Sequence, residues 1–432
     1  MKVAVVGGGI TGVSAARFLL DRGHAPTVFE ATARIGGLCG SDVVDGFVVD
    51  HAGGHILYSV DKEVLDFLLG ALGPDGAVRS ERRTRIFHRG RYVSYPFENG
   101  LGDLAPADNF ECLKGYVEAA FARRAGAPEP ADFHAWCLWR FGEGICRQFM
   151  HPYNEKIWNV DLRRLGVAWV RGRVPDAPID DVLRAAVGLK TTGYAHQAIF
   201  WYPKQGGFEA IVHAVARTLP EGVIRLSTPV RRVERAGGRW SVDGESFDHV
   251  LSTAPLTLLP AFAPEMPASV RAACEGLTYT SLLTVFVALK HDRLPDYSWV
   301  YFPHPENGPQ NRITYLSNYA PANAPPGCGS VMAEVTYLGP RPDPDRTAKE
   351  VVEGLVRCGV FAADDVLFTR TYDNRFAYVL YEHGLEERVA TVRAWAQSIG
   401  LGLAGRFGNY NYYNSDRCVR AALDAAEALG RA

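Results

Sequence analysis

The chain has 432 residues, 47% of them hydrophobic, which is enough for two or three subdomains with sizeable buried cores. Its 46 basic and 48 acidic residues give a formal net charge of −2, so no overall field attracts nucleic acid or an anionic membrane. Any anion-binding site must therefore be local, and we expect no nucleic-acid partner.

The cysteines and the apolar segments set the expected environment. The eight cysteines are scattered without a Cys-x-x-Cys pair, which argues against structural zinc, a redox dithiol and a disulfide framework. We expect no metal site and a reducing, cytoplasmic location. The first apolar run is broken by three glycines, and no stretch has the length of a membrane span, so we expect neither a signal peptide nor membrane insertion.

The first thirty residues predict a dinucleotide-binding unit. The β-branched run "KVAVV" predicts a buried parallel strand, and a helical pattern follows the glycines Gly7, Gly9 and Gly12. Gly7 allows a tight turn, Gly9 lets the backbone approach a pyrophosphate, and Gly12 lets the helix pack closely on the strand. A second strand ends at Glu30, which is placed to accept hydrogen bonds from ribose hydroxyls.

The residues after this acid favour FAD over NAD. Arg34, Gly36 and Gly37 complete a Glu-x-x-x-Arg-x-Gly-Gly pattern. This pattern resembles FAD-binding enzymes of the glutathione-reductase and amine-oxidase kind, in which the arginine and the glycine pair approach the FAD diphosphate. Segment 223–255 resembles the part of those proteins that returns to the dinucleotide domain, and the likeness puts the backbone of Val230 at the adenine.

The end of the chain completes this expected cofactor site. Residues 405–416, "GRFGNYNYYNSD", precede a final helical pattern, and Asn414, Ser415 and Asp416 can cap its start beside the flavin. FAD would then be held by segments from both ends of the chain and from its middle.

The predicted fold is α/β. It consists of a Rossmann-like FAD-binding domain of the glutathione-reductase type with an inserted helical domain and an antiparallel β-sheet substrate domain. Residues 102–190 are rich in helical patterns and carry little strand signal. The predicted boundaries are 1–95, 195–255 and 390–432 for the FAD-binding domain, 102–190 for the helical domain and 256–389 for the β-sheet domain.

Further segments carry candidate site residues. His55 follows two glycines and a predicted strand, where its imidazole could adjust the protonation of a flavin; the alternative is a turn with a capped histidine. Aromatic rings and an amide in the helical region and in the segment just before it could hold a nucleotide base, although core packing is the ordinary explanation; these residues are Tyr95, Phe97, Asn154 and Trp158.

Six short blocks, in order along the chain, resemble UDP-galactopyranose mutase, and the eukaryotic type more than the bacterial one. The blocks are Gly-Gly-His at 53–55, "YPFEN" at 95–99, "PYNEKIW" at 152–158, "WVRGRV" at 169–174, "RITYLSNY" at 312–319 and "GRFG" at 405–408. Six ordered matches are far more specific than a glycine motif.

The resemblance implies a role for each candidate. Arg173 and Arg312 would clamp a substrate diphosphate from opposite sides, and Arg406 would lie near the flavin and the sugar. His55 would lie beside the flavin ring. The implied phosphate-binding tyrosines are Tyr319, Tyr378 and Tyr412, and the implied uridine pocket consists of Tyr95, Phe97, Asn154 and Trp158.

The implied reaction interconverts the pyranose and furanose forms of a UDP-galactose-like sugar. FAD would act in its reduced form, its N5 attacking the anomeric carbon, while the protein supplies position and field. The implied partners are a nucleotide-diphosphate sugar and an external reductant such as NAD(P)H or a reductase. A homo-oligomer is compatible with the chain.

Two alternatives remain open. An FAD-dependent amine oxidase or protoporphyrinogen-oxidase-like enzyme would have an apolar pocket, and a flavoprotein could bind a nucleotide sugar without turnover. Two positions depart from the mutase pattern. Ser415 replaces a longer polar side chain, and Glu98 replaces an amide at the base pocket, where it could favour a donor-rich edge such as guanine or, as we expect, face solvent.

Overall fold

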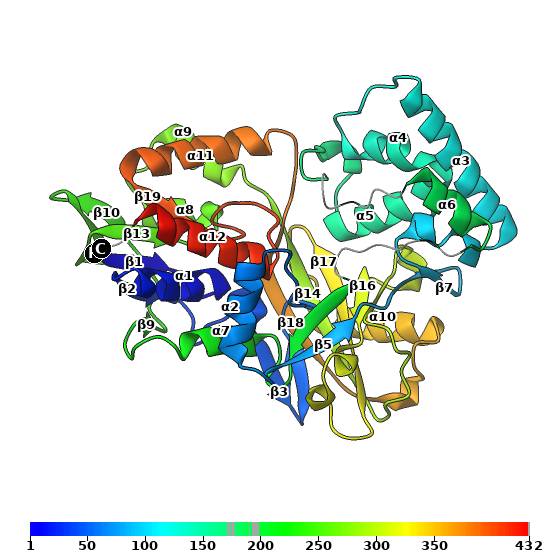
Figure 1. The fold of residues 1–432 in the computed structure, drawn as a ribbon, viewed down its shortest axis with the longest axis horizontal. Coiled ribbons are helices and arrows are strands. Elements are labelled where there is room, and N and C mark those ends of the chain that lie inside the picture. The colour runs from blue at the N-terminus through cyan, green and yellow to red at the C-terminus, as the bar shows by residue number, and fades with distance from the viewer. Residues whose placement is uncertain (171–173, 175–177, 190, 192–197, 431–432) are drawn as a thin grey trace.

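The protein is described from a computed structural model, which covers residues 1–170, 174, 178–189, 191 and 198–430. A parallel sheet with helices on both faces lies at one end of the molecule, and a larger, mainly antiparallel sheet lies beside it (Figure 1). A group of helices extends beyond the second sheet. The predicted α/β class, with a Rossmann-like unit and an antiparallel sheet, is confirmed.

The parallel sheet is buried on both faces because successive side chains of its strands enter different cores. Val3 and Val5 belong to one apolar cluster, while Ala4 and Val6 belong to another. The strand order is β19-β13-β1-β2-β9, with bounds β1 Lys2–Val6, β2 Ala25–Phe29, β9 Ile224–Arg225, β13 His249–Ser252 and β19 Leu401–Leu403.

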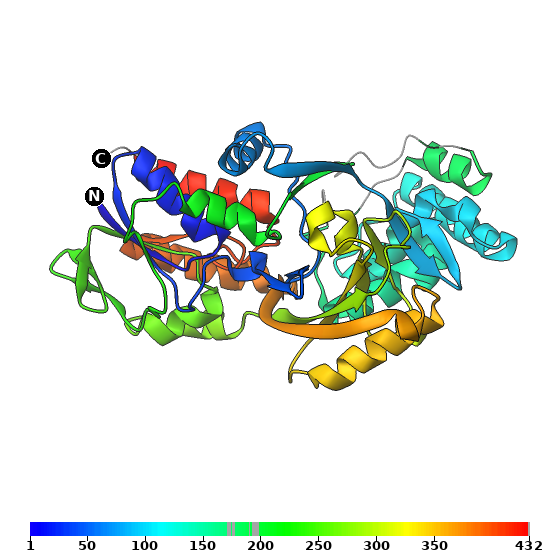
Figure 2. The same ribbon diagram turned by 90° about the horizontal axis from the view of Figure 1, so that it is seen from below.

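Helices cover the two faces of this sheet. One layer contains α1 Ile10–Asp21, α7 Glu209–Ala216 and α12 Ser415–Ala428, with α2 Lys62–Leu72 packed beside them (Figure 2). The other face carries α8 Leu259–Phe262, α9 Ala268–Glu275 and α11 Leu385–Ile399, together with a small antiparallel sheet of β10 Val233–Ala236, β11 Arg239–Val242 and β12 Glu245–Phe247.

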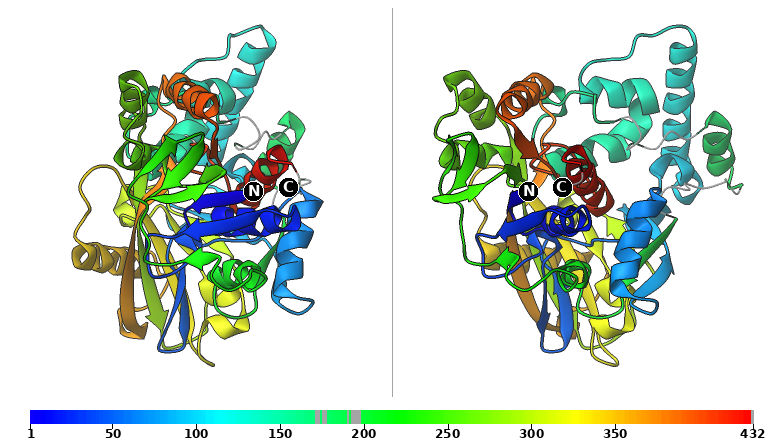
Figure 3. Two further views of the ribbon diagram at one scale, coloured as in Figure 1. Left: turned by 90° about the vertical axis from the view of Figure 1, so that its left-hand side faces the viewer. Right: turned by 60° about the vertical axis from the view of Figure 1, so that its left-hand side comes forward.

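Both ends of the chain build this unit. The two termini lie close together at its edge (Figure 3), where Arg22 pairs with Glu427 at 3.0 Å and a ring nitrogen of His24 lies 2.9 Å from the carbonyl of Gly430. The strands therefore come from the start, the middle and the end of the sequence.

The second sheet has seven strands in the order β18-β14-β17-β16-β15-β6-β7. Its pairs are antiparallel except for β15 with β6. Strands β6 and β7 come from residues 84–94, within a stretch that the predicted boundaries assign to the FAD-binding domain; the domain division itself stays a prediction. The strands are β6 Thr84–His88, β7 Arg91–Ser94, β14 Tyr279–Leu289, β15 Trp299–Tyr301, β16 Arg312–Thr314, β17 Gly329–Tyr337 and β18 Val366–Val379.

The helical group follows β7 in the chain. It contains α3 Pro106–Arg124, α4 Phe133–Ile145, a π-helical turn at Cys146–Met150, α5 His151–Trp158 and α6 Ile179–Ala186. Its aromatic core shares a cluster with β14 and β18, which fixes the helices against the second sheet. The remaining elements are the pairs β3 Ser41–Val44 with β4 Phe47–Asp50 and β5 Ala77–Glu81 with β8 Ile199–Pro203, and α10 Pro344–Arg357 on the second sheet.

Within the described ranges, no helix combines the length and the apolar character that a membrane crossing requires.

Gly12 should be intolerant of a side chain. A Cβ atom at this position would lie 1.9 Å from the carbonyl oxygen of Gly7, so helix α1 and the first turn would have to separate. We expect Gly12→Ala to lower the free energy of unfolding by about 2–3 kcal/mol, measured by urea denaturation.

Gly70 in α2 is the matched control, because a Cβ there meets nothing within 4 Å. Gly70→Ala should raise stability by up to about 1 kcal/mol through helix propensity. Equal effects of the two substitutions would contradict the packing role of Gly12.

Candidate functional site

A cavity of about 1260 Å³ lies where the parallel sheet, the second sheet and the helical group meet. Most residues singled out in the sequence line it. They are Gly7, Gly9, Glu30, Gly36, Gly37, His55, Tyr95, Phe97, Asn154, Trp158, Val230, Arg312, Tyr378, Arg406, Tyr412, Asn414 and Asp416. Three others lie outside the lining, namely Gly12, Arg34 and Tyr319. Arg173 falls outside the described residues.

The start of helix α1 forms one end of the cavity. Gly7 has φ +107°, which permits the turn after β1, and the N-cap residue Gly9 has no side chain to occupy the helix start. The backbone N–H of Gly8 donates to Glu30 Oε2 at 2.7 Å. A Cβ on Gly9 would meet only the carbonyl of Gly36, 3.9 Å away. This open helix terminus suits a pyrophosphate, and the residues present fit FAD.

Glu30 lies at the end of β2, as the sequence predicts. Its Oε1 accepts hydrogen bonds from the backbone and hydroxyl of Thr32, both at 2.8 Å. These contacts and the Gly8 bond fix the carboxylate at the cavity wall. Its contact with ribose stays a prediction.

Arg34 braces the cofactor loop instead of lining the cavity. Its guanidinium pairs with Glu209 at 2.5 Å and with Asp42 at 2.7 Å. Glu209 in turn lies behind Gly36, where an added Cβ would come within 2.9 Å of its carboxylate. The expectation that Arg34 approaches a diphosphate directly is corrected, because the two carboxylates hold its guanidinium behind the loop.

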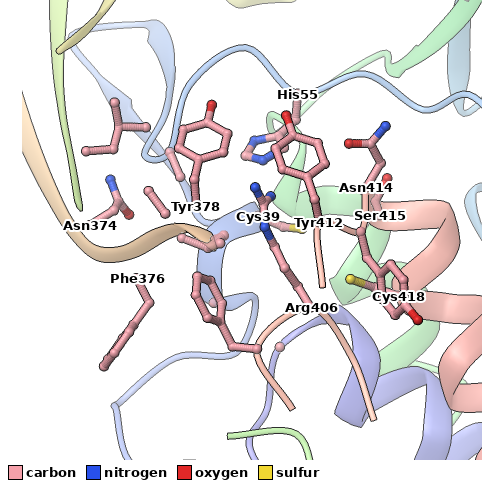
Figure 4. A pocket seen from close by; sticks show the side chains of 18 of the residues that line it. Cys39, His55, Asn374, Phe376, Tyr378, Arg406, Tyr412, Asn414, Ser415 and Cys418 are labelled. Carbon is pink, nitrogen blue, oxygen red and sulfur yellow. The ribbon is translucent and has the colours of Figure 1, made fainter. Parts of the chain in front are cut away.

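Arg406 presents an unpaired charge to the middle of the cavity. Its Nε and Nη2 are buried and have no hydrogen-bond partner. The guanidinium lies 4.9 Å from the ring centre of Tyr378 and 4.6 Å from that of Tyr412. Figure 4 shows it extending between the two tyrosines toward His55 and Cys39. A buried cation with free donors is costly unless an anion or an acceptor meets it, so the arrangement points to an anionic or acceptor-rich ligand.

His55 is neutral in this environment. Burial, together with the charges of Arg406 and Arg312, lowers the pKa of His55 to about 3. Its Nδ1 is buried and has no partner. The imidazole can therefore offer one hydrogen bond to a ligand without carrying charge.

Arg312 is already paired with a carboxylate that the sequence analysis did not identify. Its Nη2 and Nε lie 2.6 and 2.8 Å from Glu334 Oε1. Glu334 is 1% exposed and also accepts a bond from the backbone of Gly54 at 3.2 Å. Burial opposes the charge on Arg312, but the adjacent carboxylate raises its pKa well above the ordinary value. The cross-strand register of β16 and β17 could have revealed this pair, since Arg312 and Glu334 are direct partners.

The two glycines before His55 make room for this pair. A Cβ on Gly53, which has φ +89°, would lie 2.6 Å from the Glu334 carboxyl carbon. A Cβ on Gly54 would lie 2.2 Å from the hydroxyl of Thr314. The two glycines therefore allow the loop before His55 to lie close to the second sheet.

A series of aromatic rings forms the end of the cavity next to the helical group. Phe97 stacks on Phe149 at 5.1 Å and 8°, and Phe149 stacks on Tyr153 at 5.3 Å and 11°. Tyr153 meets Tyr301 edge to face at 5.2 Å. The sequence analysis missed Phe149, Tyr153 and Tyr301; the first two are spaced four residues apart, which places them on one helical face.

Two polar residues at this end differ from expectation. Asn154 lines the cavity, but its amide donates to Met150 O at 2.7 Å and accepts from Trp158 Nε1 at 3.2 Å. Glu98, expected to face solvent, is only 3% exposed and lines the cavity, so that expectation is wrong. Its loop is turned inward with Phe97, which is fully buried.

Tyr319 belongs to the core. Its ring packs 5.2 Å from Phe200 and 5.3 Å from Tyr202, and the residue is 1% exposed. Its hydroxyl has no hydrogen-bond partner. The phosphate contact expected for Tyr319 is corrected accordingly, because its ring packs against Phe200 and Tyr202 and the residue does not line the cavity.

Helix α12 brings a second helix start to the cavity. Asn414 is its N-cap residue, but its side chain makes no capping bond. Asp416 accepts a hydrogen bond from Ser59 at 2.9 Å and so ties the helix to the segment after His55. The expectation that the Asn414 side chain caps this helix is therefore corrected. The first backbone N–H groups of α12 lie beside the cavity and receive no hydrogen bond from Asn414.

Arg82 is a further cation that the sequence analysis did not identify. Its guanidinium lies 4.5 Å from the ring centre of Tyr95 and 5.0 Å from that of Trp299, on the cavity wall. No motif marks this residue, which comes from the loop between two strands.

All eight cysteines are free thiols. In the part of the chain that the structure describes, no group of three or more His, Cys, Asp or Glu side chains is arranged to hold a metal ion. The cytoplasmic location expected from the cysteines stays a prediction.

The chain is similar to several flavoproteins. A family model described as "Flavin containing amine oxidoreductase" matches residues 10–429. A crystal structure of reduced UDP-galactopyranose mutase superimposes with a TM-score of 0.92 at 25% identity, covering 99% of this chain and 95% of that one. The likeness to this mutase that the sequence motifs indicate is thereby confirmed.

Two of the curated relatives are the following oxidases. Mitochondrial protoporphyrinogen oxidase of Nicotiana tabacum is 23% identical over 303 residues, 59% of this chain and 58% of the relative. Putrescine oxidase of Kocuria rosea is 27% identical over 276 residues, 59% and 53% of the two chains. The matches span little more than half the length of these relatives.

The Arg312–Glu334 pair should contribute to stability. Glu334→Gln leaves the guanidinium without its counter-charge, and we expect a loss of about 2–3 kcal/mol in the free energy of unfolding. The loss should be below that of a fully buried pair because the Arg312 side chain is 22% exposed. Urea denaturation measures the change.

Glu118→Gln is the control, because Glu118 in α3 is 66% exposed in its side chain and should change stability by less than about 0.5 kcal/mol. A Glu334→Gln protein as stable as this control would show that the pair contributes nothing.

Proposed function

The chain belongs to the flavin-containing amine oxidoreductase family, and we propose that within it this protein is an FAD-dependent mutase. It would interconvert the pyranose and furanose forms of a nucleotide-diphosphate sugar of the UDP-galactose type. The observation that carries the proposal is the buried, unpartnered guanidinium of Arg406 between Tyr378 and Tyr412, at the junction of the glycine-rich loop and the aromatic end of the cavity. The match to reduced UDP-galactopyranose mutase supports it.

The charge of this site argues against an amine substrate. A protonated amine would meet the unpaired cation of Arg406, with Arg312 and Arg82 also on the cavity wall. A diphosphate carries about two negative charges, which are tolerable in a buried site only when charged and hydroxyl donors surround them. Arg406 and the tyrosine hydroxyls meet that requirement.

FAD would be held by the start of α1, by Glu30 and by the backbone at Val230, and when bound and reduced it supplies the nucleophile for the anomeric carbon. The protein's own side chains bind and orient the substrate. Arg312 and Arg406 would each contribute about 1.5–3 kcal/mol of hydrogen bonding to the diphosphate, and each phenol about 1 kcal/mol.

The same groups would serve the bond-breaking step. They stabilise the negative charge that develops on the departing phosphate, and they keep that group close enough to rejoin the sugar. Neutral His55 can donate or accept one hydrogen bond through its free Nδ1 without adding charge. No net oxidation occurs, so an external reductant such as NAD(P)H or a reductase is needed only to keep the cofactor reduced.

Reduction should switch the activity on. We expect dithionite-reduced enzyme to convert UDP-galactofuranose to UDP-galactopyranose and oxidised enzyme to convert none, as measured by chromatography of the two isomers. Peroxide release from putrescine or another amine by the oxidised enzyme would favour an oxidase. Nucleotide-sugar binding without either product would favour a binding protein.

Arg406 should act mainly on turnover. Arg406→Ala should lower kcat by about 100-fold, since removal of one preorganised donor to developing charge costs this much in comparable sites. Tyr412→Phe should lose only about fivefold, equivalent to one neutral hydrogen bond.

Arg293→Ala, an exposed arginine outside the cavity lining, is the control and should match the unmodified enzyme in kinetics and FAD content. Unchanged kinetics of Arg406→Ala at full FAD content would refute the phosphate role.

A further inference from the structure

The phenol group of Tyr381 holds the turn that carries Arg406, although Tyr381 itself does not line the cavity. Its hydroxyl accepts the backbone N–H of Tyr412 at 2.6 Å and donates to Oδ1 of Asn411 at 2.7 Å. The backbone N–H of Asn411 in turn donates to the carbonyl of Arg406 at 2.8 Å. A phenol hydroxyl can donate and accept at the same time, so Tyr381 uses both functions on two adjacent residues.

The ring of Tyr381 also belongs to a closed series of aromatic contacts. It stacks on Trp169 at 5.7 Å and 26°, and Trp169 meets Trp158 edge to face at 5.2 Å. Trp158 meets Tyr378 edge to face at 6.2 Å, and Tyr378 stacks on Tyr412 at 5.7 Å and 15°. The hydrogen bond from the Tyr412 backbone to the Tyr381 hydroxyl closes the series.

This series joins three parts of the fold around Arg406. Trp158 ends helix α5, Tyr378 lies in strand β18, and Tyr412 precedes helix α12. The Arg406 guanidinium lies between the rings of Tyr378 and Tyr412, at 4.9 and 4.6 Å from their centres (Figure 4). Because the guanidinium rests on these two rings, their placement sets the position of its free Nε and Nη2.

We propose that Tyr381 is a positioning residue for the isomerisation: its hydroxyl holds Tyr412 and, through that ring, the Arg406 guanidinium where negative charge develops on the departing phosphate. The inference rests on the proposed function, because it assumes that Arg406 meets a diphosphate. Preorganised donors act only while they are held in place, and a misplacement of about 1 Å can cost up to about 100-fold in rate. The Tyr381 hydroxyl should therefore matter more for turnover than for binding.

Tyr410 offers a matched comparison in the same segment. Its hydroxyl donates to the carbonyl of Thr278 at 2.7 Å, and the residue is 2% exposed. Its ring meets Phe407 edge to face at 5.9 Å, belongs to a core cluster and does not line the cavity. Loss of either phenol hydroxyl removes a hydrogen bond that fastens the C-terminal segment, but the bonds of Tyr381 lead to Arg406.

The test compares Tyr381→Phe with Tyr410→Phe, since each variant loses one hydroxyl and keeps its ring. For Tyr381→Phe we expect kcat of the reduced enzyme with UDP-galactofuranose to fall about tenfold, while KM changes by less than about threefold. Titration calorimetry of oxidised, FAD-loaded protein with UDP should show Kd raised by no more than about threefold. Tyr410→Phe should stay within about twofold of the unmodified protein in all three values. FAD content and near-ultraviolet circular dichroism check that both variants are folded.

A double-mutant cycle decides whether Tyr381 acts through Arg406 or only fastens the chain. In the Arg406→Ala background, Tyr381→Phe should lower kcat by less than about twofold further, because the group that it positions is gone. If the two losses multiply, or if Tyr381→Phe and Tyr410→Phe have equal effects, Tyr381 is structural and the inference is wrong. No isomerisation by the unmodified reduced enzyme would refute the proposed function, and the positioning role in turnover with it.

Discussion

The carboxylate of Glu334 joins the parts of the molecule that meet at the cavity. From the centre of β17 it pairs with Arg312 on β16 and accepts the backbone N–H of Gly54. The hydroxyl of Tyr378 on β18 lies 3.5 Å from its other oxygen. The loop that carries His55 is therefore attached to the second sheet through one buried group. That attachment is possible only because residues 53 and 54 lack side chains.

The charges of the cavity follow from this pairing. Arg312 is held in place and largely neutralised by Glu334, whereas Arg406 is enclosed by two phenol rings and keeps two nitrogens free. A paired cation costs less to bury than an isolated one, but it also attracts an anion less strongly. Arg312 thus gives the site a paired cation and Arg406 an unpaired one, and Arg82 also lies on the cavity wall.

Groups of different chemistry line successive parts of the cavity. Helix starts and glycines form the end next to the parallel sheet. The guanidinium of Arg406 and the phenol groups of Tyr378 and Tyr412 form the middle, and stacked rings with one acid form the end next to the helices. This order matches a dinucleotide cofactor, a diphosphate and a base. The family match extends over residues 10–429 and so includes all three parts of the cavity. We attribute the proposed difference in chemistry from the oxidases to the middle and the far end.

The sequence by itself determined the features that depend on neighbouring residues. The strand, the turn glycines and the helix of the first unit were predictable because Gly7 and Gly12 have roles set within a few residues of chain. Residue types at ordered motifs also placed His55, Arg312 and Arg406 in one cavity. The directions of side chains were decided by tertiary structure. Tyr319 turns into the core, Arg34 turns toward Glu209, and Glu98 turns inward, because each direction depends on partners far away in the sequence. The sequence analysis missed Glu334 for the same reason, because only the pairing of β16 with β17 shows that its carboxylate lies opposite Arg312.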